Sequence, residues 1–298
     1  MESETVGGLF VYDYNFDEEK RLFHKENFRA KDLDLNRDVN QLACSQVFAN
    51  GTSNIMLIDQ DGSDLKEVTE GDSIDEAPSW IPGGKRRLLF QSSGVARNKD
   101  GYVVGRGPTS IQALDLDGSR LDTVLEDSRY DFLQPHIGKD EYMYYIRRPY
   151  EIPKYSSQTA VIDFFLLPFR LLRAVFHNLN FFSMVYSKKP LTTASGPDIR
   201  GDDLKHVMIK GKVIDAEKAL RTSPCTLGVP SLVPSSWELV RCSQNGSEDV
   251  VAKNVAAFDI GSDGTLVYSN GRGIFSLANP AKPKLVLKDN FIEEVVIG

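Results

Sequence analysis

The chain has 298 residues, of which 41% are hydrophobic and 10% aromatic, so it can bury a substantial core and is not expected to be disordered. Its 35 Lys and Arg residues against 42 Asp and Glu residues give a net charge of −7, which argues against a nucleic-acid-binding surface. The first residues, MESETVGG, have neither a basic region nor a long apolar run, so no signal peptide is predicted. A cytoplasmic location is expected for the sequence as given, and a periplasmic one if the natural chain carries an export leader.

The three cysteines, Cys44, Cys225 and Cys242, form no CxxC motif and show no metal-ligand spacing. Each lies in an apolar stretch typical of a strand. We therefore expect thiols in a reducing compartment, although one disulfide is an alternative. No metal and no cofactor are predicted.

Nearly the same fourteen residues occur twice, 56 positions apart: IDQDGSDLKEVTEG from Ile58 and LDLDGSRLDTVLED from Leu114. Each copy places an Asp-Gly pair, Asp61-Gly62 or Asp117-Gly118, between two apolar segments. Because Asp and Gly tolerate positive φ, this pattern predicts a hairpin. The flanking strands are expected at Ile55–Ile58, Leu65–Thr69, Ile111–Leu116 and Leu121–Leu125. Similar hairpins are predicted at Gly8–Glu26, Trp237–Lys253 and Gly273–Asp289.

A second kind of unit, consisting of a short strand, a polar turn and a more apolar strand, precedes most of these hairpins. Its copies are Leu33–Gln46, Ala77–Ser93, Gln134–Pro149 and Ala256–Gly271. Two hairpins in tandem make a four-stranded antiparallel sheet of about 40 residues, the period of a propeller blade.

These repeats resemble those of the TolB-like (WD40-like, PD40) six-bladed β-propellers. The closest copies are DEAPSWIPGGKRRLLF, from Asp75, and LDLDGSRLDTVL, from Leu114. The resemblance implies an all-β fold in which residues 1–298 form a single six-bladed propeller of four-stranded antiparallel blades. It also implies protein or peptide partners bound at the mouth of a central channel.

The two ends of the chain predict how such a ring closes. Phe291–Gly298 is typical of the first strand of a blade, whereas Gly8–Glu26 is typical of the last two strands of one. Pairing of the N- and C-terminal strands would complete one mixed blade and remove two open sheet edges.

One segment departs from the strand pattern. Thr159–Pro190 has helical periodicity, and residues 150–196 are interpreted as an amphipathic insertion within the fourth blade. The segment is interrupted at Pro168 and is too short to cross a bilayer. Three interpretations remain open: a helix folded against the propeller, a helix lying in a membrane surface, and a docking surface for a protein or a second copy. The residues expected to face a partner or membrane are Phe169, Arg170, Leu172, Arg173, Phe176, Phe181 and Phe182.

No catalytic motif is present: GxSxG, HExxH, the P-loop and GxGxxG are all absent, and no catalytic residue is predicted. The Asp-rich turns lack the closing Glu of an EF-hand loop, so they are interpreted as turns rather than calcium sites.

The candidate binding residues are Asp75, Glu76, Asp131 and His136. His136 is expected to begin an innermost strand, and the three acids are expected in the loops that enter such strands. In a propeller these positions would approach the channel mouth. One interpretation is a solvated funnel whose acids cap strand ends. The other is a funnel for a cationic or peptide ligand, with Asp75 and Asp131 as acceptors and His136 as a pH-sensitive group.

The sequence therefore favours a non-enzymatic scaffold that binds a protein or peptide, with no nucleic-acid partner. Two alternatives stay open: a hydrolase or lyase with a small-molecule site in the central channel, and a peripheral membrane protein anchored by the insertion. The identity of the partner and the oligomeric state are not predicted.

Overall fold

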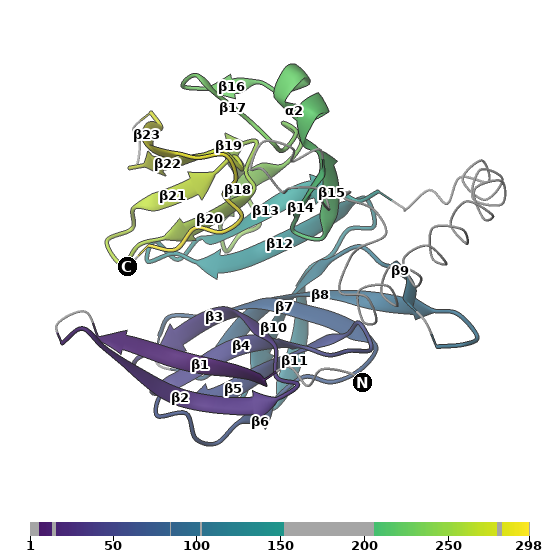
Figure 1. Cartoon of the computed structure of the whole chain (residues 1–298), viewed down its shortest axis with the longest axis vertical. Coiled ribbons are helices and arrows are strands. Elements are labelled where there is room, and N and C mark those ends of the chain that lie inside the picture. The colour runs from purple at the N-terminus through teal and green to yellow at the C-terminus, as the bar shows by residue number, and fades with distance from the viewer. Residues whose placement is uncertain are drawn as a thin grey trace, which may run out of the picture. The chain divides into compact units, whose positions relative to one another are not determined.

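The computed structural model describes residues 6–13, 16–83, 85–101, 103–151, 206–278 and 282–297. All of them belong to one unit of the chain, Met1–Glu151 together with Lys205–Gly298; the other unit, Ile152–Leu204, lies outside the described residues. Strands make up most of the described elements, and antiparallel pairs join nearly all of them (Figure 1). The structure is therefore all-β, as the repeats predict.

The first hairpin stands as a two-stranded sheet. It consists of β1 (Val6–Asp13) and β2 (Glu18–Glu26), and neither strand pairs with any other described strand. The predicted hairpin Gly8–Glu26 is confirmed.

The next nine strands form one sheet made of two antiparallel meanders. The first has β3 to β6 and the second has β7, β8, β10 and β11, while β9 pairs only with β8. A single parallel pair, Ser53 with Ile74, joins the meanders. The strands are β3 (Ala30–Asn36), β4 (Gln41–Val47), β5 (Ser53–Asp59), β6 (Lys66–Glu67), β7 (Ser73–Trp80), β8 (Arg87–Arg97), β9 (Val103–Arg106), β10 (Ser110–Asp115) and β11 (Arg120–Leu125).

Two further four-stranded antiparallel sheets follow. The first has the order β12-β13-β18-β19 and the second β20-β21-β22-β23. Their strands are β12 (Tyr130–Ile137), β13 (Met143–Pro149), β18 (Glu238–Cys242), β19 (Glu248–Lys253), β20 (Ala257–Ile260), β21 (Leu266–Ser269), β22 (Gly273–Leu277) and β23 (Lys284–Lys288). Each repeat of the sequence thus corresponds to one meander.

Between β13 and β18 the chain leaves its sheet. The described part of this excursion contains β14 (His206–Ile209), β15 (Lys212–Asp215), α2 (Ala216–Thr222), β16 (Cys225–Thr226) and β17 (Val229–Pro230). Asp215 caps α2 by accepting a hydrogen bond from the backbone N of Lys218 at 2.9 Å. The predicted helix with its partner-facing residues 169–182 lies outside the described residues. Within the described part, no helix is long and apolar enough to cross a membrane.

The core lies between successive sheets. Leu133 and Ile146 pack with Phe258 and Phe275, which joins the β12–β19 sheet to the β20–β23 sheet. Tyr145 packs with Leu89 and links β13 to β8. Burial of these apolar side chains supplies the main stabilising free energy of a chain whose sheets share few backbone hydrogen bonds.

The predicted pairing of the terminal strands is not confirmed. Phe291–Ile297 is not a strand, and its Ile292 donates a backbone hydrogen bond to the carbonyl of Gly271 at 2.9 Å. Ile292 and Val295 are buried against the β20–β21 hairpin. The segment therefore obtains its apolar burial from its own neighbouring sheet. Four four-stranded meanders and one separate hairpin are described, and six closed blades are not confirmed.

Candidate functional site

The strands that open three of the meanders, β3, β7 and β12, share one irregularity. Each has a break in register with its partner, and at each break a residue other than glycine adopts positive φ: Asp32 at 53°, Ala77 at 51° and Gln134 at 54°. Such bulges redirect the following side chains, and strained backbone of this kind concentrates at functional sites. β7 contacts both β3 and β12, so the three bulges belong to neighbouring strands.

Two residues after each bulged residue stands a polar side chain: Asp34, Ser79 or His136. In the fourth repeat the same offset gives Asp259 on β20. Ser79 Oγ lies 3.0 Å from His136 Nδ1, and the edge of the His136 ring meets Phe258, next to Asp259, with the ring centres 5.5 Å apart. We call Asp34, Ser79, His136 and Asp259 the central polar cluster.

The two carboxylates of this cluster accept hydrogen bonds from backbone groups. Asp34 Oδ2 accepts from the N–H of Trp80 at 2.7 Å, and Asp259 Oδ2 accepts from the N–H of Ile297 at 2.8 Å. Among the described residues, no basic side chain lies within ion-pair distance of either carboxylate. Both aspartates are partly exposed.

Burial and charge act in opposite directions on His136. Burial lowers the pKa of His136, the charges of Asp259 and Asp34 oppose that effect, and the charge of Lys210 adds to it. Burial also raises the pKa of Asp34, an effect partly offset by the hydrogen bond from Trp80. The imidazole is therefore held toward its neutral form beside two acids.

The bulges are tied to neighbouring strands by side chains. Asp32 Oδ2 accepts from the N–H of Ala77 at 3.2 Å, and Gln91 Oε1 accepts from the N–H of Gln134 at 2.8 Å. Gln134 Nε2 in turn donates to the carbonyl of Phe258 at 2.9 Å. These bonds connect β3 to β7, β8 to β12 and β12 to β20, and so hold the central polar cluster in place.

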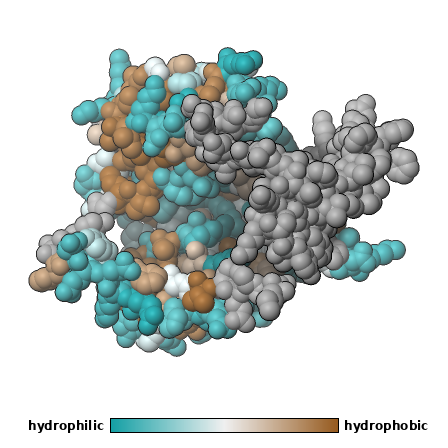
Figure 2. Space-filling model, viewed as in Figure 1, coloured by the Kyte–Doolittle hydropathy of each residue, from teal (hydrophilic) through white to brown (hydrophobic). Residues whose placement is uncertain are grey.

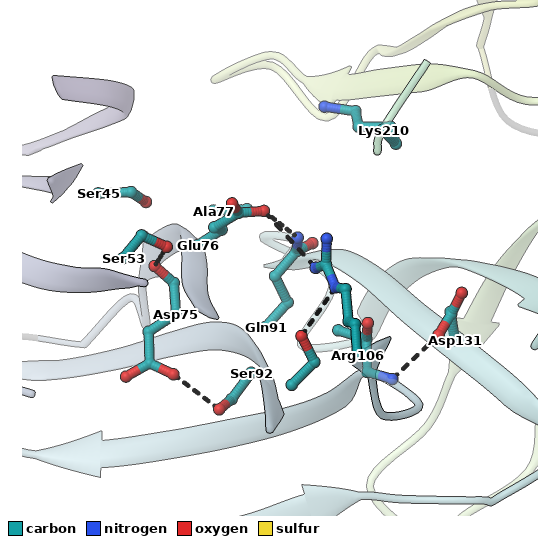
Figure 3. A network of polar contacts seen from close by, with 12 residues as sticks. Ser45, Ser53, Asp75, Glu76, Ala77, Gln91, Ser92, Arg106, Asp131 and Lys210 are labelled. Carbon is teal, nitrogen blue, oxygen red and sulfur yellow. Dashed lines mark hydrogen bonds and ion pairs between the residues drawn. The ribbon is translucent and has the colours of Figure 1, made fainter. Parts of the chain in front are cut away.

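A second network surrounds Glu76, one of the predicted site residues. Glu76 accepts from Lys31 Nζ at 2.8 Å and from Gln91 Nε2 at 3.2 Å, and Arg106 lies 3.9 Å away. Arg106 Nε also donates to Ser93 Oγ at 2.9 Å. Figure 3 shows Glu76, Gln91 and Arg106 turned toward one another. The charge of Glu76 is therefore compensated by cations of the chain itself.

The structure buries the other two predicted acids. Asp75 is 4% exposed and accepts a hydrogen bond from Ser92 Oγ at 2.7 Å (Figure 3). Asp131 is 6% exposed and accepts from Arg148 Nε at 2.9 Å and from the N–H of Thr109 at 3.0 Å. These bonds give both carboxylates a structural task, and a role for them as ligand acceptors stays a prediction.

The turn between β14 and β15 reaches the same region. Lys210 occupies it with φ of 46°, and its carbonyl accepts from Arg148 Nη1 at 3.0 Å. The ammonium of Lys210 is bound to Glu294 in the C-terminal segment. This ion pair compensates the one lysine whose charge acts on His136.

The described residues contain no group of three or more His, Cys, Asp or Glu side chains placed to bind a metal ion. All three cysteines are free. Two surface features are apolar. A groove of about 560 Å³ lies between the first hairpin and β3 to β5, lined in part by Leu9, Leu33 and Leu35. Hydrophobic side chains also gather over the β20–β23 sheet (Figure 2), where Val286 and Leu287 are exposed.

Sequence reasoning proposed His136 and Glu76 as binding residues but did not propose Asp34, Ser79 or Asp259. The signal was present in the aligned units LDLN, PSWI, PHIG and FDIG, whose second residues are these four polar side chains. It becomes interpretable only when the bulge shared by β3, β7 and β12 shows that this position converges from neighbouring strands.

No protein-family model matches the chain, and no curated protein matches it. Among solved structures, the chain is similar to the tricorn protease (13% identity, 95% of this chain and 28% of that one, TM-score 0.45). It is also similar to TolB from Acinetobacter baumannii (13%, 96% and 60%, TM-score 0.40). A third similar structure is oligogalacturonate lyase from Vibrio parahaemolyticus (9%, 94% and 71%, TM-score 0.42).

This chain spans less than two thirds of the length of the tricorn protease and of the Acinetobacter TolB. At these identities the similarity concerns the fold and not the activity. The described part of the chain is all-β, and the solved structures that the chain is similar to include two TolB proteins, the family that the repeats resemble.

Proposed function

We propose that this chain is a non-enzymatic module that binds a peptide or an extended segment of a partner protein at the inner strands β3, β7, β12 and β20. The observation that carries this proposal is the central polar cluster, to which the first strands of four meanders each contribute one side chain from an equivalent position. A bulge repeated in three strands is a costly feature that packing alone does not require.

The same proposal includes a closed propeller of six blades. Four meanders of the described chain have the strand order of blades, and the first hairpin has the strands of half a blade. The apolar groove beside that hairpin offers burial to a further strand. In such a ring the four inner strands would surround the ligand.

Selection of a displayed library of random twelve-residue peptides on the full chain tests the binding function. The informative variant is Glu76→Gln with His136→Gln, which alters both polar networks without a large change in volume. The matched control is Glu18→Gln with His24→Gln, because both residues are exposed on β2.

We expect selected peptides to bind the wild type and the β2 control equally, and the Glu76/His136 variant at least roughly tenfold more weakly, as expected for loss of polar contacts in a binding site. Failure to enrich any peptide, or equal binding to all three proteins, would refute the proposed function.

A hydrolase is the second candidate, because Ser79 Oγ lies 3.0 Å from His136 Nδ1, with the carboxylate of Asp34 close enough to act on the imidazole. A serine activated by a histidine is a common nucleophile. However, Ser79 is only 3% exposed, which keeps a substrate carbonyl from its hydroxyl. Labelling with a fluorophosphonate probe discriminates the two functions, since an enzyme would be labelled in the wild type and not in Ser79→Ala.

A further inference from the structure

The first hairpin has one edge without a strand partner. β1 pairs with β2 alone, so among the described strands nothing lies beside the other edge of residues 6–11. This stretch contains no charged residue and no proline, the features by which exposed edges usually prevent pairing. Phe10 and Val11 are 55% and 45% exposed. The edge is therefore able to accept a further strand.

The repeats of the chain indicate which strand belongs at this edge. Gly8-Leu9-Phe10 of β1 matches Gly273-Ile274-Phe275 of β22, since each begins the hairpin of its repeat. β22 pairs with β23 on one edge and with β21 on the other, where the ring of Tyr268 stacks on that of Phe275 at 5.2 Å. Phe275 is fully buried, whereas Phe10 is exposed. Within the described chain, β1 thus lacks the neighbour that β22 has.

The sheet face next to this edge is uncovered as well. Leu33 and Leu35 of β3 are 53% and 37% exposed, while the residues at the same two positions of the other three meanders are buried or half-buried. Trp80, the counterpart of Leu35, packs against Ala43 of β4 and Leu57 of β5, the second and third strands of the preceding meander. β1 and β2 correspond to the third and fourth strands of a meander. The strand that would cover the two leucines is therefore the second one, which would pair with β1.

The groove between the first hairpin and β3 suits such a strand. It has a volume of about 560 Å³, and its lining includes Phe10, Val11, Leu33 and Leu35. Arg37 also lines it and forms no hydrogen bond or ion pair with any described residue. An extended segment with apolar side chains and an acidic residue near one end would pair with the edge, fill the groove and compensate this charge.

The C-terminal segment, which was the candidate for this position, is held elsewhere. Ile292 and Val295 are buried against Ala257 of β20 and Val267 of β21. The backbone N–H of Ile292 donates to the carbonyl of Gly271 at 2.9 Å. A segment held in this way cannot pair with β1 at the same time.

We propose that β1 accepts an extended strand from a partner protein, which pairs antiparallel with residues 6–11 and covers Leu33 and Leu35. The partner segment carries apolar residues at alternating positions, which enter the groove, and an acidic residue near Arg37. The further strand of this groove then comes from outside the chain. This surface adds a second binding site to the proposed function and does not use the central polar cluster.

The probe is a synthetic peptide with the sequence of residues 256–270, AAFDIGSDGTLVYSN, which contains β20, β21 and the turn with Asp263. In the chain this hairpin presents β21 to β22, so the free peptide can present the same strand to β1. A peptide of the same composition in scrambled order is its control. Fluorescence anisotropy of the labelled peptide measures binding to the full chain, and hydrogen exchange of backbone amides reports strand addition.

The informative variant is Val11→Lys with Leu33→Lys, which places two charges in the groove at side chains that are 45% and 53% exposed. The matched control is Val124→Lys with Leu121→Lys, which changes the same residue types on the outer strand β11 at 44% and 57% exposure. Because all four side chains are exposed, both variants are expected to fold, which far-UV circular dichroism checks.

We expect the peptide to bind the wild type and the β11 control with equal affinity. The Val11/Leu33 variant should bind it at least roughly tenfold more weakly, because a charge opposes both edge pairing and apolar burial. The bound peptide should slow hydrogen exchange in β1 by roughly tenfold or more and leave β11 unchanged. The scrambled peptide should not bind.

Absence of binding, equal binding of the scrambled peptide, an unchanged affinity of the Val11/Leu33 variant, or unchanged exchange in β1 would each overturn the inference. If that variant does not fold, hydrogen exchange of the wild type decides. The Glu76→Gln/His136→Gln variant should bind the hairpin peptide as the wild type does, so the two binding sites can fail separately. Loss of hairpin binding in the Glu76/His136 variant would assign the peptide to the central polar cluster and also overturn the inference.

Discussion

The buried ion pair of Asp131 and Arg148 provides the sharpest test of how the fold supports the site. The two residues face each other across β12 and β13, and their side chains are 9% and 7% exposed. Arg148 lies over the ring of Trp237 at 4.8 Å and donates to the carbonyl of Lys210. Burial lowers the pKa of Arg148 and the charge of Asp131 opposes that effect, so the guanidinium depends on its partner.

Asp131→Ala would leave the guanidinium buried without its counter-charge and the N–H of Thr109 without its acceptor. Removing one partner of a buried pair costs about 3–5 kcal/mol. For a domain of this size each kcal/mol lowers the Tm by about 2–4 °C, which predicts a decrease of roughly 6–20 °C. In Asp131→Ala with Arg148→Met the unpaired charge is absent, so this double variant should be more stable than Asp131→Ala alone.

Urea unfolding followed by tryptophan fluorescence measures these differences, with an unchanged m value as the sign that stability alone has changed. Asp127→Ala is the matched control. Asp127 pairs with Arg129 through a similar geometry, but Arg129 is exposed to solvent, and no resolvable loss is expected there. If Asp131→Ala loses no more stability than Asp127→Ala, the burial argument is refuted.

Three other predictions follow from local geometry. Gly62→Ala should destabilise the chain by roughly 1–3 kcal/mol more than Gly246→Ala. Both positions have positive φ, but only a Cβ at Gly62 would meet the backbone of β2, at 2.2 Å. The midpoints of urea unfolding of the two variants test this difference. Burial raises the pKa of Cys44 to about 12, so Cys44 should resist a thiol reagent in the native chain while the exposed Cys225 reacts. Equal labelling rates would contradict this. Because burial lowers the pKa of His136, the unfolded chain binds that proton more tightly, so stability should fall as the pH drops below about 6.5; His136→Gln should reduce this slope.

Local turn chemistry was enough to predict most strands. The hairpins around Asp61-Gly62 and Asp117-Gly118 occur where the sequence places them. The expected positive φ is found at Gly62 but not at Asp61, Asp117 or Gly118, and in the second turn Ser119 adopts it instead. The same reasoning predicts a strand at Phe291–Ile297, and the structure has none there. Its alternating apolar residues would suit a strand, but its backbone hydrogen bonds go to Gly271 and to the side chain of Asp259. A choice between competing burial sites is a property of the tertiary structure and is not contained in a local pattern.

The candidate site was predictable only in part, for a related reason. Side chains along a regular strand alternate between the two faces of the sheet, so the position in the sequence predicts the face on which each side chain lies. A bulge breaks that alternation. Asp75 precedes the bulge of β7 and is buried, whereas Ser79 follows it and meets His136. Ala and Gln are residue types that rarely adopt positive φ, so the sequence gives no sign of the bulges at Ala77 and Gln134. The register of each strand with its partner must be known before each side chain can be assigned to a face of the sheet.

The buried pair and the central polar cluster belong to one continuous set of contacts. Asp131 accepts a hydrogen bond from Arg148, and Arg148 donates another to the carbonyl of Lys210. The ammonium of Lys210 forms an ion pair with Glu294. Three residues after Glu294, the N–H of Ile297 reaches the carboxylate of Asp259. The carboxylate of Asp259 is therefore oriented by contacts that begin in the core of the β12–β19 sheet. An acceptor held in this way loses little conformational entropy when it receives a ligand N–H, which is the condition for a small polar cluster to bind a flexible peptide.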